Sequence, residues 1–205
     1  MMGPVVDYYE ARYRAHGEGA RGMDWRDEAS QRLRFERLVA HLDLAGSPRL
    51  VDVGCGNGEL LSFLTTAAVA VDYLGIDVAP AMVEACRRRH GDERAVLAST
   101  ADLGRLGPFD YAVVSGTFNV KQDVPASVWA RYVRRAIGET YASCRRGVAF
   151  NVMTTAVDHR YPHLYYMSLQ RVAEIAAACG TRRFHVDHAY PLYEMTVTLL
   201  RPEPR

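Results

Sequence analysis

Three glycines in the segment GCGNG give the first chemical signal, because they lie between the apolar run RLVDV and a leucine-rich stretch. Gly54, Gly56 and Gly58 let the main chain turn tightly and approach a ligand with no side chain between. A dinucleotide-binding pattern would require glycine where the chain has Glu59. A carboxylate at a helix start repels pyrophosphate, and the Lys and Ser or Thr of a Walker loop are missing. The loop therefore favours an adenosyl ligand without phosphates.

A carboxylate follows at the end of the next apolar run, where Asp77 closes the segment GID nineteen residues after Gly58. An acid at this place accepts hydrogen bonds from both hydroxyls of a ribose in nucleotide-binding folds of the doubly wound type. The loop and the acid together predict an adenosine site at the carboxyl edge of a parallel sheet.

Strand and helix patterns alternate along the chain, which predicts the scaffold of this site. Strands are predicted over 49–53, 72–78, 95–100, 109–116, 147–154, 182–190 and 193–202, and helices over 27–42, 59–67, 79–90, 126–143 and 168–179. The last two strands are joined by a short turn, so they must be antiparallel, because a parallel pair needs a long crossover. We expect an α/β fold with a seven-stranded, mostly parallel, doubly wound sheet, a C-terminal antiparallel hairpin and helices on both faces.

Length and composition limit the classes of protein and partner. A chain of 205 residues suits one domain, 1–205, which we divide into an N-terminal helical lid, 1–45, and a core, 46–205. Lys plus Arg number 25 and Asp plus Glu 24, so neither a nucleic acid nor a membrane surface is the expected partner. The four cysteines are widely spaced, which disfavours zinc and disulfides and favours a reducing cytoplasm.

Four motifs in order resemble the class I methyltransferases that use S-adenosylmethionine: VDVGCGNG, GIDVAPAMVEAC, STADL and FDYAVVSG. The match runs from about Arg49 to Thr154 and is followed by the expected closing hairpin. The chain is also similar to small bacterial enzymes of this class that have no appended acceptor domain. In that group an N-terminal tyrosine helix and the helix containing SQRLRF roof the pocket.

The resemblance assigns the methionine end of the cofactor to residues after two strands. Gly54, Gly56 and Gly58 are expected to border the methionine moiety. Asp52 is expected to support the loop and the amino group of the cofactor, directly or through water. Ser115 is expected to lie near the methionine carboxylate and amine.

The same resemblance assigns the adenosine end. Asp77 is expected to hold the ribose, and Val78 to lie against the adenine face. Asp102 is expected to meet the exocyclic amine of adenine, and Leu103 to pack on its ring. A plain turn acid is the alternative role for Asp102.

The acceptor is expected to be a small molecule, and no metal is expected. The segment SGTFNV replaces the signature of DNA and glutamine amino-methyltransferases, and it offers no carboxylate to hold magnesium. Cytosine-ring methylation needs a cysteine after a proline, which the chain lacks. For the catalytic end we select Asn119 and Asn151 at strand ends, and Tyr9 and Tyr166 in segments that could cover the cofactor. No obvious general base stands out among the histidines of the covering segments.

Three functions remain open at this level. The first is methyl transfer from S-adenosylmethionine to a small metabolite, catalysed mainly by positioning and leaving S-adenosylhomocysteine. The second is cyclisation, in which the α-amine of the cofactor attacks its own γ-carbon inside an aromatic box, giving azetidine-2-carboxylate and methylthioadenosine. The third is a non-catalytic module that binds S-adenosylmethionine and regulates a partner.

Overall fold

The computed structural model describes residues 3–19, 22 and 25–202 of the chain. Its helices are α1 (Gly3–His16), α2 (Glu28–Val39), α3 (Glu59–Thr66), α4 (Pro80–His90), α5 (Leu103–Leu106), α6 (Ala126–Ala142) and α7 (Leu169–Ala178). Its strands are β1 (Arg49–Val53), β2 (Asp72–Asp77), β3 (Ala95–Leu97), β4 (Phe109–Val114), β5 (Cys144–Met153), β6 (Phe184–Asp187) and β7 (Glu194–Leu200). None of the helices in the described ranges has the length and apolar character that a membrane span requires.

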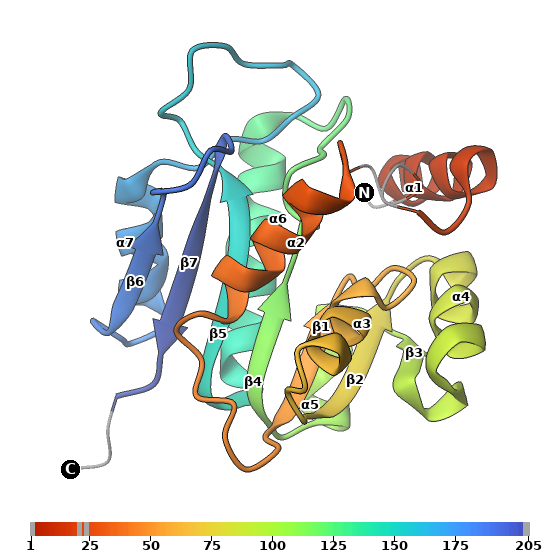
Figure 1. Cartoon of the computed structure of the whole chain (residues 1–205). Coiled ribbons are helices and arrows are strands. Elements are labelled where there is room, and N and C mark those ends of the chain that lie inside the picture. The colour runs from red at the N-terminus through yellow and green to blue at the C-terminus, as the bar shows by residue number, and fades with distance from the viewer. Residues whose placement is uncertain (1–2, 20–21, 23–24, 203–205) are drawn as a thin grey trace.

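The seven strands form one sheet in the order β3-β2-β1-β4-β5-β7-β6 (Figure 1). The pairs β1–β2, β2–β3, β1–β4 and β4–β5 are parallel. Strand β7 runs antiparallel between β5 and β6, so the C-terminal hairpin closes the sheet as predicted. From β1 the chain adds β2 and β3 on one side, and then returns to add β4 and β5 on the other side. The switch point therefore lies between β1 and β4, and ligands bind at such points in open α/β sheets.

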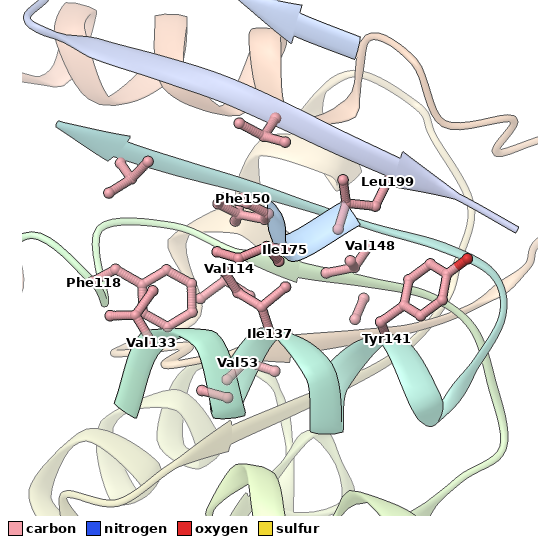
Figure 2. Packing of buried hydrophobic residues seen from close by; sticks show 14 of the residues in the cluster. Val53, Val114, Phe118, Val133, Ile137, Tyr141, Val148, Phe150, Ile175 and Leu199 are labelled. Carbon is pink, nitrogen blue, oxygen red and sulfur yellow. The ribbon is translucent and has the colours of Figure 1, made fainter. Parts of the chain in front are cut away.

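Alternate strand residues supply the two faces of the sheet with separate cores. On one face, Ala112 and Val114 of β4 pack with residues of α6 and α7, as Figure 2 shows for Ile137 and Ile175. On the other face, Tyr111 of the same strand packs with residues of α2 and α3. Successive side chains of β4 thus point to opposite faces of the sheet, and each face packs against a layer of helices. Helices on both faces of the sheet were predicted from the sequence.

The lid predicted over residues 1–45 contains α1 and α2, and its residues 1, 2, 20, 21, 23 and 24 lie outside the described ranges. Helix α2 begins after Asp27, whose side chain accepts a hydrogen bond from the main-chain N–H of Ser30 at 2.7 Å. In Figure 1, α1 lies beyond the carboxyl ends of the central strands. Both helices are thus close to the strand ends where the ligand loops leave the sheet.

Several predicted strands extend past the observed bounds, for example 109–116 against β4 and 182–190 against β6, and the end of β3 shows a physical cause. Strand β3 ends at Leu97, whereas the pattern predicts a strand to residue 100. Ser99 and Asp102 form reciprocal side-chain to main-chain hydrogen bonds that cap a short helical turn, Thr100–Asp102, and α5 follows directly. The serine therefore turns the chain out of the sheet two residues after β3.

Candidate active site

A cavity of about 470 Å³ lies at the carboxyl ends of β1, β2 and β4. Its wall is built by α1, α2, the loops after four strands, one face of α6, the segment between β5 and α7, and the first residue of β7. The lining residues include Tyr8, Tyr9, Trp25, Arg34, Asp52, Gly54, Gly56, Glu59, Asp77, Val78, Ser115, Asn119, Tyr132, His163 and Glu194. A cavity of this size suits a cofactor together with a small ligand.

The glycine loop has the conformation that its glycines predict. Gly54, Gly56 and Gly58 have φ angles of +75°, +55° and +82°, a region that residues with a Cβ rarely enter. Gly54 and Gly56 line the cavity, and a Cβ at Gly54 would lie 2.2 Å from the hydroxyl of Thr117. Gly58 faces away, toward α4, where a Cβ would lie 2.6 Å from the His90 ring. Its contribution is to let the loop enter α3, beside the cavity rather than at its surface.

Asp77 lies at the end of β2, as predicted, and lines the cavity. Its Oδ2 accepts a hydrogen bond from the N–H of Gly56 at 3.0 Å, and its Oδ1 accepts one from the N–H of Ala79 at 2.9 Å. Burial raises the pKa of this carboxyl, and the main-chain donors act in the opposite direction. The acid fastens the glycine loop and also presents lone pairs to a ligand.

Asp52 is buried beneath the loop, with 3% of its surface exposed. It accepts a hydrogen bond from the hydroxyl of Tyr73 at 2.8 Å. Burial raises the pKa of Asp52 to about 7, the Tyr73 hydroxyl opposes this rise, and the charge of Asp77 adds to it. A cation bound nearby would favour the ionised form, which suits the predicted role beside the amino group of the cofactor.

The residues assigned to the adenine end are divided between the cavity wall and the protein interior. Val78 lines the cavity and is 39% exposed. Asp102 and Leu103 lie outside the lining, which is formed there by 98–101. The Asp102 carboxylate accepts hydrogen bonds from the N–H and hydroxyl of Ser99 and pairs with Arg105. Leu103 is fully buried in the core under α6. Asp102 therefore caps the turn and Leu103 packs in the core, and their contacts with adenine stay predictions.

Ser115 and Asn119 line the cavity, and Asn151 lies directly behind them. Asn151 is fully buried; its Oδ1 accepts from the N–H of Gly116 at 2.7 Å and its Nδ2 donates to the Ser115 hydroxyl at 3.2 Å. Asn119 accepts from the N–H of Met153 at 3.0 Å through its Oδ1. Asn151 therefore shapes the loop after β4 without reaching the cavity.

The aromatic wall is made by residues of three segments. Tyr8 and Tyr9 of α1 meet edge to face, with ring centroids 5.3 Å apart, and Trp25 and Phe35, before and within α2, complete the aromatic lining together with Tyr132 of α6. Tyr166 lies outside: its hydroxyl accepts from the N–H of Tyr161 at 2.9 Å. The predicted aromatic cover thus includes Tyr9, whereas the segment carrying Tyr166 contributes His163 instead.

A charged pair at the far end of the cavity was missed on sequence. Arg34 of α2 donates through Nε to Oε2 of Glu194 at 2.7 Å, and Asn119 donates to Oε1 at 2.9 Å. Glu194 is 2% exposed, and the Arg34 guanidinium lies 4.4 Å from the centroid of the Trp25 ring. The paired residues are 160 positions apart, so no local pattern links them.

Comparison with known sequences decides the family. A family model described as a methyltransferase domain matches residues 51–140. A Mycobacterium tuberculosis protein named as a methyltransferase, Rv1506c, is 33% identical over 149 residues, which cover 71% of this chain and 89% of that protein. This chain belongs to the class I S-adenosylmethionine-dependent methyltransferase family.

Solved methyltransferases show the same fold. The magnesium protoporphyrin IX methyltransferase of Synechocystis PCC 6803 matches this methyltransferase with a TM-score of 0.73 at 16% identity, over 98% of this chain and 100% of that chain. The 1,6-didemethyltoxoflavin-N1-methyltransferase of Burkholderia thailandensis matches with a TM-score of 0.65 at 20% identity, over 97% and 88%.

The residues of this methyltransferase fit S-adenosylmethionine, the cofactor of its family. Among the described residues, Asp77 takes its hydrogen bonds from main-chain N–H groups, which leaves carboxylate lone pairs for two ribose hydroxyls. Asp52 and Asp77 supply the acidic groups at the cofactor end of the cavity, whereas the Glu59 carboxylate is paired with Arg89. An acidic wall attracts a sulfonium and an ammonium and repels phosphates, so the structure supports the adenosyl interpretation of the loop.

Proposed function

We propose that this methyltransferase transfers the methyl group of S-adenosylmethionine to a small-molecule acceptor in the cytoplasm, without nucleic acid or membrane as partner. One observation carries the proposal: a single cavity joins the acidic cofactor end, at Asp77, to a separate polar cluster at Glu194. The second end lies between α2 and β7, away from the loop after β2, and provides groups for an acceptor.

Bound S-adenosylmethionine supplies an electrophilic methyl group on a positively charged sulfur. The chain contributes binding, orientation and exclusion of water. Asp77 would hold the ribose, and Asp52 would balance the charge of the amino group. Aromatic faces of Tyr8, Tyr9 and Trp25 would stabilise a cation beside them by about 2 kcal/mol or more where water is excluded.

Positioning can account for most of the catalysis. Holding donor and acceptor in line is worth roughly 7–11 kcal/mol of barrier. Helix α1 and the segment 154–168 supply the cover: Tyr9 comes from the first and His163 from the second. Two bridges, Val120 with Leu164 and Thr154 with Met167, tie the second segment to the sheet region.

Two structural neighbours are named for small acceptors, magnesium protoporphyrin IX and 1,6-didemethyltoxoflavin. Their identities of 16% and 20% transfer the fold alone, so the acceptor of this chain is proposed from its own cavity.

The test separates an extract of bacterial cells into fractions below and above about 3 kDa and supplies each with S-adenosylmethionine and the protein. We expect S-adenosylhomocysteine to accumulate with the small fraction and not with the large one. Turnover that needs the large fraction would overturn the small-molecule acceptor. Methylthioadenosine and azetidine-2-carboxylate from the cofactor alone would establish the cyclisation alternative.

A further inference from the structure

We propose that Glu194, held by Arg34 and Asn119, is a catalytic base that takes the proton from an acceptor hydroxyl, which makes this enzyme an O-methyltransferase of hydroxyl compounds. The inference rests on the proposed function, because it assigns the acceptor end of the same cavity. It adds a base where the sequence offered none, and it selects one chemical class of acceptor.

Glu194 is buried in the protein and yet lines the cavity. A glutamate that is 2% exposed requires partners for its charge, and this one faces a cavity instead of being enclosed by protein on all sides. The first position of β7 fixes the residue, since it pairs with Met153 of β5, another residue of the cavity wall. In addition, its main-chain oxygen lies 2.8 Å from Nδ1 of His188. The carboxylate is therefore held on a rigid strand at the cavity surface.

The hydrogen bonds of the carboxylate leave it capacity for a ligand. Arg34 donates to Oε2 at 2.7 Å and Asn119 donates to Oε1 at 2.9 Å, so each oxygen has one protein donor. An ionised carboxylate oxygen accepts more than one hydrogen bond. Asn119 cannot rotate freely, because its own Oδ1 accepts from the N–H of Met153 at 3.0 Å. The remaining lone pairs of Glu194 are therefore oriented by fixed neighbours.

Arg34 lies beside Glu194 in the cavity wall and can face the same acceptor atom. Its Nη1 donates to the carbonyl oxygen of Ser30 at 3.0 Å, and its guanidinium is stacked against Trp25. Further N–H groups of the guanidinium are not engaged by the described residues and belong to a side chain that lines the cavity. A hydroxyl matches this pair, because its hydrogen bonds to Glu194 and its oxygen accepts from Arg34. The ion pair offers little attraction to a charged acceptor group, because the attraction of an ammonium to Glu194 is offset by Arg34 and the attraction of a carboxylate to Arg34 is offset by Glu194.

The polar cluster is continuous with the cofactor loop. Thr117 donates to the carbonyl oxygen of Val53 at 3.1 Å, next to Gly54, and Asn119 follows two residues later in the same turn. Trp25 packs on Gly116, where a Cβ would lie 2.6 Å from the indole ring. Thus the segment 115–119 contacts the cofactor loop at one end and Glu194 at the other. An acceptor between them would contact both the donor methyl group and the base.

The proposed step balances with the groups named. The bond between the acceptor oxygen and the methyl carbon forms as the bond between that carbon and sulfur breaks, and its electron pair returns to sulfur. The hydroxyl proton moves to the carboxylate of Glu194, and from there to solvent. Arg34 stabilises negative charge that develops on the oxygen. Base catalysis of this type is worth roughly 10²–10⁴-fold in rate.

The test uses Glu194→Gln, with Asp187→Asn as the matched control. Arg37 and Asp187 form another ion pair of α2, at 3.4 Å to β6, and neither residue lines the cavity. Both proteins receive S-adenosylmethionine with a deuterated methyl group and the small-molecule fraction of a bacterial extract. We expect the labelled product to be a methyl ether. Its rate of formation should fall roughly 10²–10⁴-fold in Glu194→Gln and less than about threefold in Asp187→Asn.

A further readout separates a base from a structural ion pair. Calorimetry should give the same affinity for S-adenosylmethionine in Glu194→Gln and the wild type, so that the loss appears in the rate of methyl transfer and not in cofactor binding. If Glu194→Gln does not fold, Glu194→Asp keeps the charge and should form the same methyl ether at a reduced rate.

The outcomes distinguish the two proposals. A labelled amine, ester or carbon-methylated product, or an unchanged rate in Glu194→Gln, overturns the inference and leaves the small-molecule methyltransferase in place. Absence of labelled small molecules with the wild type overturns the proposed function itself, and the inference with it.

Discussion

Replacing Asp77 by alanine removes one carboxylate with two tasks. Its Oδ2 accepts from the N–H of Gly56 at 3.0 Å, and its Oδ1 accepts from the N–H of Ala79 at 2.9 Å. The same carboxylate lines the cavity where the ribose hydroxyls are expected. The substitution therefore removes ligand contacts and also loosens the glycine loop that borders the ligand.

The expected loss follows from the charge of the acceptor. Hydrogen bonds to a charged group contribute about 1.5–3 kcal/mol, which corresponds to roughly one to two orders of magnitude in the dissociation constant. Loosening of the loop acts in the same direction, because a mobile loop must be ordered again when the ligand binds. We expect Asp77→Ala to weaken S-adenosylmethionine binding at least tenfold.

Isothermal titration calorimetry with S-adenosylmethionine measures this change, and Asp110→Ala is the control. Asp110 accepts a hydrogen bond from the N–H of Arg49 at 2.9 Å, at the amino ends of β1 and β4 and away from the cavity. The control removes a comparable carboxylate contact with the main chain, and its affinity should stay within about twofold of the wild type. Equal affinities of Asp77→Ala and the wild type would refute the placement of the cofactor.

Three further substitutions test other parts of the structure. Asp52 has a folded pKa of about 7 against an ordinary value of 3.8, so wild-type stability falls as pH rises between these values. In urea unfolding without ligand, Asp52→Asn should gain roughly 2–3 kcal/mol more over the wild type at pH 8 than at pH 5; equal gains would contradict the raised pKa. Gly58→Ala, with φ +82° and a Cβ 2.6 Å from His90, should lose about 1–3 kcal/mol of stability, whereas Gly138→Ala, in open space on α6, should lose none. Tyr166→Phe should keep turnover within about threefold in a product assay, because its hydroxyl contacts Tyr161 outside the cavity; a larger loss would place Tyr166 in the catalytic machinery.

Local spacing explains why the glycine loop and Asp77 could be predicted to lie together at the strand ends. The glycines precede a helix by a fixed number of residues, and Asp77 ends the neighbouring strand, so both positions follow from strand and turn patterns alone. The sheet order then brings them together, because β1 and β2 are adjacent and parallel. The fold class and the closing hairpin were predicted for the same reason: alternating patterns and loop lengths restrict the topology.

A motif does not say which of several possible partners a side chain contacts in the folded protein. Asp102 stands in a motif that resembles an adenine contact, yet its carboxylate is used by Ser99 in the turn after β3. Tyr166 lies in a covering segment, but the direction of its side chain depends on the path of a long loop. Loops of this length have no periodic pattern from which side-chain directions could be read.

The proposed acceptor end could not be predicted because it depends on long-range packing. Glu194 and Arg34 are two charged residues among many, and their pairing requires α2 to cross the sheet beside β7. A buried ion pair is recognised by the exposed fraction of its members, which the sequence does not contain. The same holds for Trp25, which takes its importance from its contacts with Gly116 and Arg34.

Transfer of a deuterated methyl group is the most direct test of the central claim, that one cavity holds both donor and small-molecule acceptor. The wild-type protein, labelled S-adenosylmethionine and purified small-molecule acceptors recovered from active fractions are incubated together and analysed by mass spectrometry. We predict one labelled acceptor for each S-adenosylhomocysteine formed. Label that stays in methylthioadenosine, or appears only on macromolecules, would contradict the account.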